Sequence, residues 1–154
     1  LFSHNTKRID DDAPRLSFIR DPVEVKILGD VPSEIELPIH PNHSEKGTRP
    51  ISLNPPNVFI ESEDARGSYR LKEFADIDQN GNIESVERSD KRPIIHWTST
   101  TTSEPSTLLI PNQKEIEYIS GRVESNDYSA GTIVQLERIG YAIVTSEGFL
   151  LMHE

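Results

Sequence analysis

Cysteine is absent from this sequence of 154 residues. Its absence excludes disulfide bonds, thiolate zinc sites and cysteine nucleophiles together. Long apolar runs are missing too: none approaches the roughly 20 residues that a membrane-spanning helix needs, and the chain does not open with a signal-peptide pattern. We therefore expect a soluble, cytoplasmic protein that works in a reducing compartment and does not bind a membrane.

Helical periodicity is also scarce. Nowhere does the apolar spacing of a surface helix, at i, i+3, i+4 and i+7, persist along the chain. Instead, eleven prolines and eight glycines separate short apolar runs, several of which alternate with polar residues, as in VEVKI at 23–27. Alternation of this kind is typical of half-buried strands, and many short strands with regular turn signals indicate a β-sandwich or β-barrel. The sequence predicts an all-β fold without an evident internal repeat.

Basic residues are fewer than acidic ones, 16 against 26, which gives a formal net charge of −10. Taken alone, this deficit argues against nucleic-acid binding, because a polyanion is normally bound by clustered lysine and arginine. The basic residues are uneven along the chain, however, with an early group and a middle group: Lys7, Arg8, Arg15 and Arg20, then Arg66, Arg70, Lys72, Arg88, Lys91 and Arg92. The sequence is therefore compatible with a local basic surface on an acidic protein.

Signatures of catalysis are missing as well. The sequence contains neither the GxSxG nucleophile elbow nor the GxxxxGKS/T phosphate loop. His40 and His43 have a spacing that suits a metal, but no third ligand is near, so we interpret them as part of a surface loop. We expect no catalytic residue, metal ligand or cofactor in this chain, and we look for its function in binding or in a larger protein.

One stretch, DIDQNGNIESVE, does match a metal-binding motif. The EF-hand calcium loop requires ligands at positions 1, 3, 5 and 12 and a glycine at position 6. These positions are filled by Asp76, Asp78, Asn80, Glu87 and Gly81. The motif by itself therefore points to a calcium-binding module.

The flanks of this stretch favour a different structure. An EF-hand needs a helix on each side, yet GSYRLKEFA alternates upstream, and Pro93 precedes the strand-like IIHW downstream. Asn80-Gly81 is also a favoured centre of a tight β-hairpin, because both residues tolerate positive φ. We predict a hairpin whose first strand begins with Arg70 and Lys72, and keep calcium binding as an alternative.

Five segments together resemble a known family, the C-terminal region of the class I glutamyl/glutaminyl-tRNA synthetases. They follow one another in the family's order, at roughly its spacing, over nearly the whole chain. The segments are APRLSFIRDPVEVKI (13–27), LPIHPNHSEKGTRPISL (37–53), YRLKEFADID (69–78), PIIHWTS (93–99) and GTIVQLERIGYAIV (131–144). The HPN loop, the IHW motif and the VQLERIGY motif are individually specific, which makes a chance match of all five improbable.

The resemblance implies an all-β pair of barrels, proximal and distal, with a fold shared with a ribosomal protein. Residues 1–12 would be the junction from a missing helical and catalytic part, 13–65 and 105–154 the proximal β-barrel, and 66–104 the distal β-barrel. The family's enzymes attach their amino acid to tRNA with ATP and Mg, using HIGH-like and KMSKS-like signatures that are absent here. The chain would then be an inactive fragment whose partners are the anticodon loop of tRNA(Glu) and the catalytic domain of the same chain.

The resemblance also implies roles for individual residues. Arg15 would contact an anticodon base, Arg70 and Lys72 would face the anticodon from the distal barrel, and Gln135 would lie near the middle base. For Arg138, an RNA contact and an ion pair with Glu137 or a neighbouring strand are equally open. Arginine presents a fork of hydrogen-bond donors, and glutamine presents both a donor and an acceptor. Lys72 stands where the glutaminyl enzymes often have arginine. A lysine can still contact a phosphate there, but it cannot make a bidentate contact.

Two further questions stay open at this level. The short distal segment and the compact end at LLMHE resemble the archaeal-type glutamyl enzymes more than the glutaminyl enzymes. The C-terminal region of a glutaminyl-tRNA synthetase is the alternative. The net charge of −10 also keeps open an all-β protein-interaction module without RNA binding.

Overall fold

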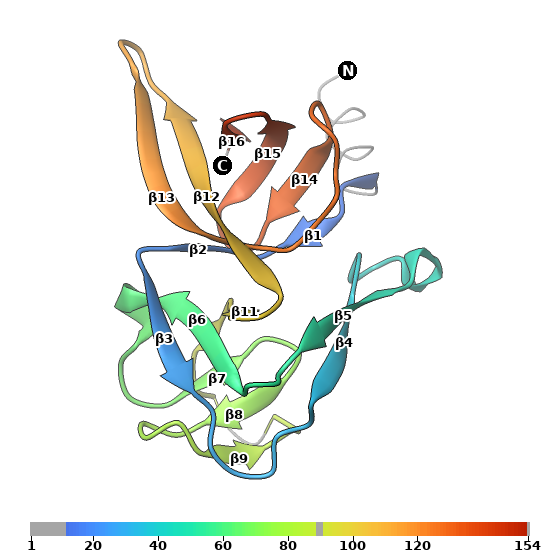
Figure 1. Ribbon diagram of the computed structural model, residues 1–154, viewed down its shortest axis with the longest axis vertical. Helices are drawn as coiled ribbons and strands as arrows, with labels where there is room; N and C mark the ends of the chain where they lie inside the picture. Colours follow the sequence, from blue (N-terminus) through green and yellow to red (C-terminus); the bar gives the residue numbers. More distant parts are fainter. Residues whose placement is uncertain (1–11, 89–90, 154) are drawn as a thin grey trace.

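Strands make up nearly all the regular structure in the computed structural model of the protein, which describes residues 12–88 and 91–153 (Figure 1). Two single 3₁₀ turns, η1 (Ser44–Lys46) and η2 (Ser62–Asp64), interrupt them. Over this part of the chain, no helix is long and apolar enough to cross a membrane. The predicted all-β fold is confirmed, while most of the predicted junction at 1–12 lies outside the described residues.

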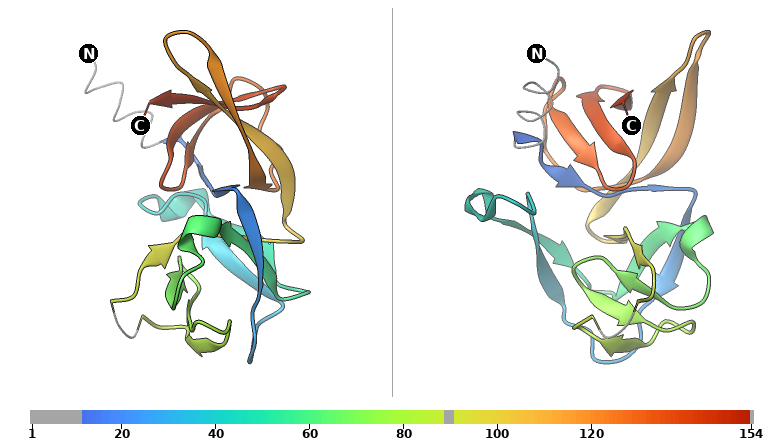
Figure 2. Two further views of the ribbon diagram at one scale, coloured as in Figure 1. Left: turned by 90° about the vertical axis from the view of Figure 1, so that its left-hand side faces the viewer. Right: turned by 180° about the vertical axis from the view of Figure 1, so that it is seen from behind.

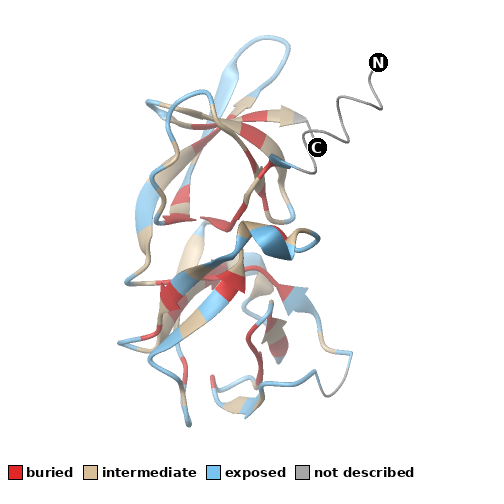
Figure 3. Cartoon of the chain, turned by 90° about the vertical axis from the view of Figure 1, so that its right-hand side faces the viewer, coloured by how far each residue is buried: buried red, intermediate tan, exposed pale blue. Residues whose placement is uncertain are grey.

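One group of strands, which we call the terminal unit, combines residues 13–20 with 103–153. In sheet order its seven strands are β1 (Arg15–Leu16), β14 (Ile133–Leu136), β15 (Gly140–Thr145), β16 (Gly148–His153), β12 (Ser103–Pro111), β13 (Ile116–Glu124) and β2 (Phe18–Arg20). Its core contains Leu16, Phe18, Leu108, Val123, Val134, Leu136, Ala142, Phe149 and Leu151. The β12–β13 hairpin extends beyond this core, and its tip is exposed (Figure 3).

The second group, which we call the central unit, comprises residues 22–99 and contains three smaller sheets. Their strands, in sheet order, are β11 (Thr98–Ser99), β6 (Asn57–Glu61) and β3 (Pro22–Lys26); β4 (Glu34–Pro38) and β5 (Thr48–Ser52); and β10 (Ile94–Ile95), β7 (Tyr69–Leu71), β8 (Ala75–Ile77) and β9 (Ile83–Ser85). Its core includes Ile27, Leu37, Ile51, Val58, Ile60, Leu71, Phe74, Ile77, Ile95 and Trp97. The two units stack along the long axis of the molecule (Figure 2).

The two cores divide the chain differently from the expected barrel boundaries. We expected residues 13–65 to belong with 105–154 and residues 66–104 to stand apart. Instead, Ile27 and Ile51 share a core with Leu71 and Trp97. Strands between residues 22 and 61 therefore pack with the segment expected to be the distal barrel, so which residues form each of the family's barrels stays a prediction.

The alternation predicted at residues 23–27 is confirmed. Val23 and Val25 pack against the central core, whereas Glu24 and Lys26 are exposed. β3 pairs antiparallel with β6, which places the apolar face of both strands on the core side. Period-two patterning thus identified this strand and its buried face.

Two segments that alternate like single strands are in fact hairpins. The strand expected to begin with Arg70 and Lys72 ends at Leu71, and the chain reverses through Glu73, whose φ is 63°. The VQLERIGY segment reverses in the same way through Arg138, with φ 64°. Neither turn contains the glycine or proline that marks a reversal in sequence.

These two hairpins are copies of one arrangement, an internal repeat that the sequence did not show. In each, the first strand pairs in parallel with a short strand from elsewhere, β10 with β7 and β1 with β14. The matching backbone amides of Arg70 and Gln135 donate to Pro93 O and Pro14 O, at 2.7 and 2.9 Å. Arg70 therefore occupies in the central unit the position that Gln135 occupies in the terminal unit.

Candidate nucleic-acid interface

The predicted calcium loop is part of a β-hairpin. β8 and β9 pair antiparallel across it, so both flanks are strands and not the helices of an EF-hand. The first motif carboxylate, Asp76, is fully buried and lies 2.9 Å from Arg70 Nη1. Asp78 Oδ1 accepts from the backbone amides of Asn82 and Asn80, at 2.9 and 2.8 Å, and the Asn82 bond is the main cause that lowers the pKa of Asp78. The predicted hairpin turn at Asn80-Gly81 is confirmed, but its first strand is β8 and does not begin with Arg70 and Lys72. The calcium alternative is not favoured.

Arg15 and Gln135, predicted from opposite ends of the chain, lie directly side by side. β1 and β14 pair in parallel with Arg15 opposite Gln135. Arg15 is only 8% exposed, and its Nη1 donates to Ala13 O at 3.5 Å. Gln135 Oε1 is buried and accepts no hydrogen bond from the residues that the structure describes. Buried polar atoms are almost always paired, so this oxygen lacks a partner that such atoms normally have. A ligand donor would reach it once the Gln135 side chain turns toward solvent.

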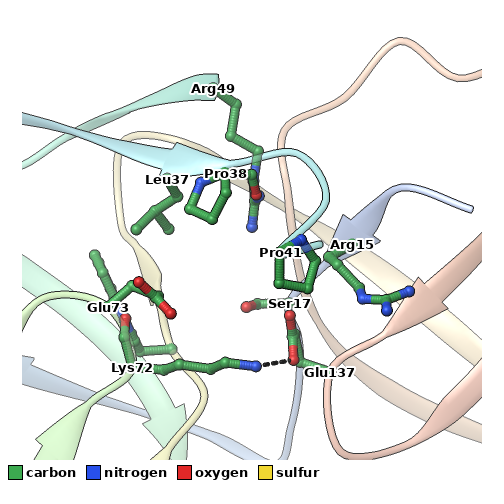
Figure 4. Close-up of a pocket in the computed structure, with 10 residues that line it drawn as sticks. Arg15, Ser17, Leu37, Pro38, Pro41, Arg49, Lys72, Glu73 and Glu137 are labelled. Carbon is green, nitrogen blue, oxygen red and sulfur yellow. Dashed lines mark hydrogen bonds and ion pairs between the residues drawn. The ribbon is translucent and has the colours of Figure 1, made fainter. Parts of the chain in front are cut away.

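A cleft beside this pair lies where the terminal and central units meet (Figure 4). It is small, with a volume of about 30 Å³, and it is open to solvent. Its lining comes from both units: Arg15, Ser17 and Glu137 from the terminal unit, and Leu37, Pro38, Pro41, Arg49, Lys72, Glu73 and Trp97 from the central unit. Three cations, two carboxylates and apolar walls therefore meet at one place on an otherwise acidic protein.

Lys72 reaches this cleft and crosses to the terminal unit. Its Nζ donates to Glu137 Oε2 at 2.6 Å, and its side chain remains 41% exposed. The backbone of Lys72 is held by Trp97, whose Nε1 donates to Lys72 O at 2.9 Å. The structure therefore places Arg15 and Lys72 on the lining of one cleft, with Gln135 opposite Arg15 on the neighbouring strand.

Arg70 is placed differently from its predicted partner Lys72. Its Nη1 donates to Asp76 across the hairpin, and its Nη2 donates to Val86 O at 3.1 Å. The side chain is only 14% exposed and does not line the cleft. The structure thus separates two side chains that the sequence grouped as one pair.

Arg138 makes an ion pair, with a partner that the sequence did not suggest. Its Nη1 and Nη2 lie 2.8 and 3.3 Å from the two carboxylate oxygens of Asp64, not from Glu137. The Arg138 side chain is 45% exposed, which leaves part of the guanidinium accessible from outside. Asp64 belongs to η2 of the central unit, so this pair is a second connection between the two units.

Residues that the prediction missed complete the interface. Arg49 binds the buried carboxylate of Glu124 through Nε and Nη2, at 2.5 and 2.7 Å, and it also donates to Pro38 O. Glu124 Oε1 accepts the backbone N–H of Ser17, the residue between β1 and β2, at 3.0 Å. These contacts join β5 of the central unit to two segments of the terminal unit. Nothing in the sequence pairs residues 49 and 124, because only the fold brings them together.

A second network surrounds Glu61 at the same junction. Arg20 Nε lies 2.7 Å from Glu61 Oε2, and His96 Nε2 lies 3.2 Å from the same oxygen, without the alignment of a hydrogen bond. Burial raises the pKa of Glu61, but the contacts with His96 and Arg20 outweigh it and lower the pKa to about 2. Glu61, Asp64 and His96 hold potential metal-binding atoms within 4.8 Å of one another, yet both carboxylates already accept hydrogen bonds from arginine. We interpret this cluster as a structural charge network.

Comparisons with known proteins place the chain in a family. The class I tRNA synthetase (E and Q) anticodon-binding domain family matches residues 13–96, and a second family of the same description matches residues 94–145. Similar proteins include the glutamate–tRNA ligases of Methanocorpusculum labreanum (32% identity, 92% of this chain, 26% of the relative), Sulfolobus acidocaldarius (35%, 94% and 27%) and Pyrococcus abyssi (29%, 92% and 28%). The chain spans about a quarter of the length of these curated relatives. It belongs to the anticodon-binding domain family of the class I glutamyl and glutaminyl tRNA synthetases.

Proposed function

We propose that this chain binds the anticodon loop of tRNA(Glu) as the C-terminal part of an archaeal-type glutamyl-tRNA synthetase. In the complete cytoplasmic enzyme, a catalytic domain outside this chain would attach glutamate to tRNA(Glu) with ATP and Mg²⁺. The isolated chain would bind RNA without ligating it. The names of the relatives, all glutamate–tRNA ligases from archaea, support the glutamyl over the glutaminyl alternative.

The observation that carries this proposal is the pairing of Arg15, which is buried, with Gln135, which is half-buried and whose Oε1 is buried. Gln135 Oε1 lacks a hydrogen-bond donor among the described residues, and the Arg15 guanidinium lies on the neighbouring strand. An unpaired uracil presents an N–H donor between two carbonyl acceptors on its Watson–Crick edge. Single-stranded loops are read by side chains that bind such edges after the base leaves its stack. The pair thus offers an acceptor for the N–H and donors for the carbonyl groups of one splayed base.

The other predicted residues would play different parts. Lys72 and Arg138, with exposed side chains, would neutralise backbone phosphates on either side of the bound base. Arg70 would hold the β7–β8 hairpin through Asp76, and only the remaining donors of its guanidinium would reach RNA. Base recognition would therefore depend on the buried Arg15 and the half-buried Gln135, and affinity on the more exposed Lys72 and Arg138.

We also propose how the family's two barrels correspond to the two cores. The terminal unit, residues 13–20 and 103–153, would form the proximal barrel. The central unit, residues 22–99, would form the distal barrel, which extends the expected segment 66–104 toward the N-terminus. Shared packing of Ile27 and Ile51 with Leu71 supports this division.

The test is a salt-dependent titration of the chain with a labelled hairpin RNA carrying the anticodon loop of tRNA(Glu). We expect saturable binding that weakens as salt rises, with a slope of about −0.7 per neutralised phosphate in a plot of log K against log salt. A hairpin of the same stem with a different middle base is the matched control, and it should bind more weakly. Absent or salt-independent binding would refute the proposal and favour a protein-interaction module.

A further inference from the structure

One ion pair of the interface joins matching positions of the two repeated hairpins. Lys72 directly follows β7 in the central unit, and Glu137 directly follows β14 in the terminal unit. Figure 4 shows their side chains meeting along one side of the cleft, with Ser17 and Glu73 on the cleft side of the pair. In the free protein, the exposed cation at this edge of the proposed RNA site is therefore bound by a carboxylate of the same chain.

The backbones at both ends of this pair are fixed, whereas the lysine side chain is not. Lys72 O accepts from Trp97 Nε1 at 2.9 Å, Glu137 N–H donates to Leu16 O at 2.9 Å, and His96 Nδ1 lies 2.9 Å from Glu137 O. The Glu137 side chain is 15% exposed and the Lys72 side chain 41%. A rotation of the lysine side chain alone can therefore open the pair, without separating the two units.

Lys72 is the more solvated partner of this pair, since its side chain is 41% exposed and that of Glu137 is 15% exposed. Ion pairs with exposed side chains change an equilibrium by at most about fivefold. An RNA phosphate offers the same charge as the Glu137 carboxylate, and neutralising it also releases counterions from the RNA. A phosphate near the cleft can therefore replace Glu137 as the partner of Lys72.

On the basis of the proposed function, we propose that Glu137 is an internal competitor of RNA. Its carboxylate binds Lys72 in the free protein, and a backbone phosphate takes its place when RNA binds. Glu137 thus lowers the affinity of Lys72 for RNA phosphates and for other polyanions. Glu137 is a positioning residue that acts through Lys72 and need not touch the RNA.

The test measures the Kd of the anticodon-loop hairpin for the full chain and for Glu137→Gln. We expect Glu137→Gln to tighten binding by about two- to fivefold, the range of an exposed ion pair. Glu117→Gln is the matched control, because it removes the same charge from an exposed position of β13 on the extended hairpin. Its effect on Kd gives the general contribution of net charge. Fluorescence of Trp97, the only tryptophan, reports whether each variant keeps the fold around Lys72.

A double-mutant cycle with Lys72→Met separates this mechanism from others. In the Lys72→Met background, Glu137→Gln should change Kd no more than Glu117→Gln does. If Glu137→Gln leaves Kd equal to that of the control or weakens binding, the competitor role is refuted while the proposed function stands. If neither the unmodified chain nor any variant binds the hairpin, the proposed function itself fails and this inference with it.

Discussion

Glu61 shows how a single residue can be held by groups from two parts of the chain. Arg20 comes from β2 of the terminal unit and His96 from the central unit, and both contact the same carboxylate. The contacts with these residues outweigh burial and lower the pKa of Glu61 to about 2. A carboxylate that ionises more readily in the folded than in the unfolded state stabilises the fold when it is charged.

We predict that Glu61 makes the protein sensitive to acid. Its contribution to the free energy of unfolding should be complete above pH 4.5, its ordinary pKa, and should be lost as the pH falls toward about 2. The pKa difference corresponds to about 3 kcal/mol. Urea unfolding of Glu61→Gln should therefore show lower stability at pH 7 and a shallower decline between pH 4.5 and 2. Parallel pH profiles for the variant and the unmodified chain would contradict this account.

Single residues also show what the sequence can and cannot predict about the site. Arg15, Lys72 and Gln135 were predicted by resemblance, because each lies in a short motif with neighbours that fix the match. Arg49 and Glu124 were missed, since their partnership depends on how β5 and β13 are placed in space. A long-range ion pair leaves no periodic signal in either segment.

At the scale of elements, the hairpin between β8 and β9 depends on one glycine. Gly81 has a φ of +91°, and a Cβ placed on it would lie 2.6 Å from the backbone oxygen of Lys26. Leu28 N–H donates to Gly81 O at 2.8 Å, which fixes the turn against the end of β3. The motif that resembled a calcium loop therefore needs glycine both for its backbone conformation and for close packing.

We predict that Gly81→Ala destabilises the protein more than a matched glycine substitution. Gly67 also has a positive φ, +62°, but a Cβ placed on it would meet no atom of the described residues within 4 Å. Gly67→Ala should cost about 1 kcal/mol, the conformational cost of a left-handed residue, whereas Gly81→Ala should cost about 2–3 kcal/mol because the backbone must also move. Equal losses in urea unfolding would show that the contact with Lys26 is unimportant.

Strands in which apolar and polar residues alternate could be predicted from the sequence. Strands joined by a turn without glycine or proline could not. β3 follows the expected pattern because Val23 and Val25 pack inward between exposed charged residues. The turns at Glu73 and Arg138 place ordinary side chains at positive φ, which sequence rules assign to glycine or asparagine. The repeat formed by the β7–β8 and β14–β15 hairpins could not be detected in the sequence, because few residues are identical at matching positions of the two hairpins.

At the scale of the whole molecule, buried ion pairs connect the two units. The Arg49–Glu124 pair crosses between them, and the Glu124 side chain is only 2% exposed. Glu124 also accepts from the backbone of Ser17, next to the Arg15–Gln135 pair. The arrangement of the cleft therefore depends on contacts that only the assembled molecule provides.

We predict that Glu124→Gln strongly destabilises the protein. The substitution leaves the Arg49 guanidinium without its ionised partner at a nearly buried position, which should lower the free energy of unfolding by about 3 kcal/mol. Urea unfolding followed by far-UV circular dichroism and by Trp97 fluorescence measures this loss. Glu117→Gln, which removes an exposed carboxylate from the same strand, should leave the unfolding midpoint unchanged. A similar midpoint for both variants would show that the pair does not hold the units together.

The proposed contact between Gln135 and an anticodon base is removed by Gln135→Met with little change in side-chain shape. Methionine has a similar shape and removes the unsatisfied Oε1, so stability in urea should stay the same or increase. The Kd for the tRNA(Glu) anticodon hairpin should rise by about tenfold, within the roughly 1–3 kcal/mol range of a side-chain contact to a base edge. A stable variant that binds the hairpin as tightly as the unmodified chain would contradict the account.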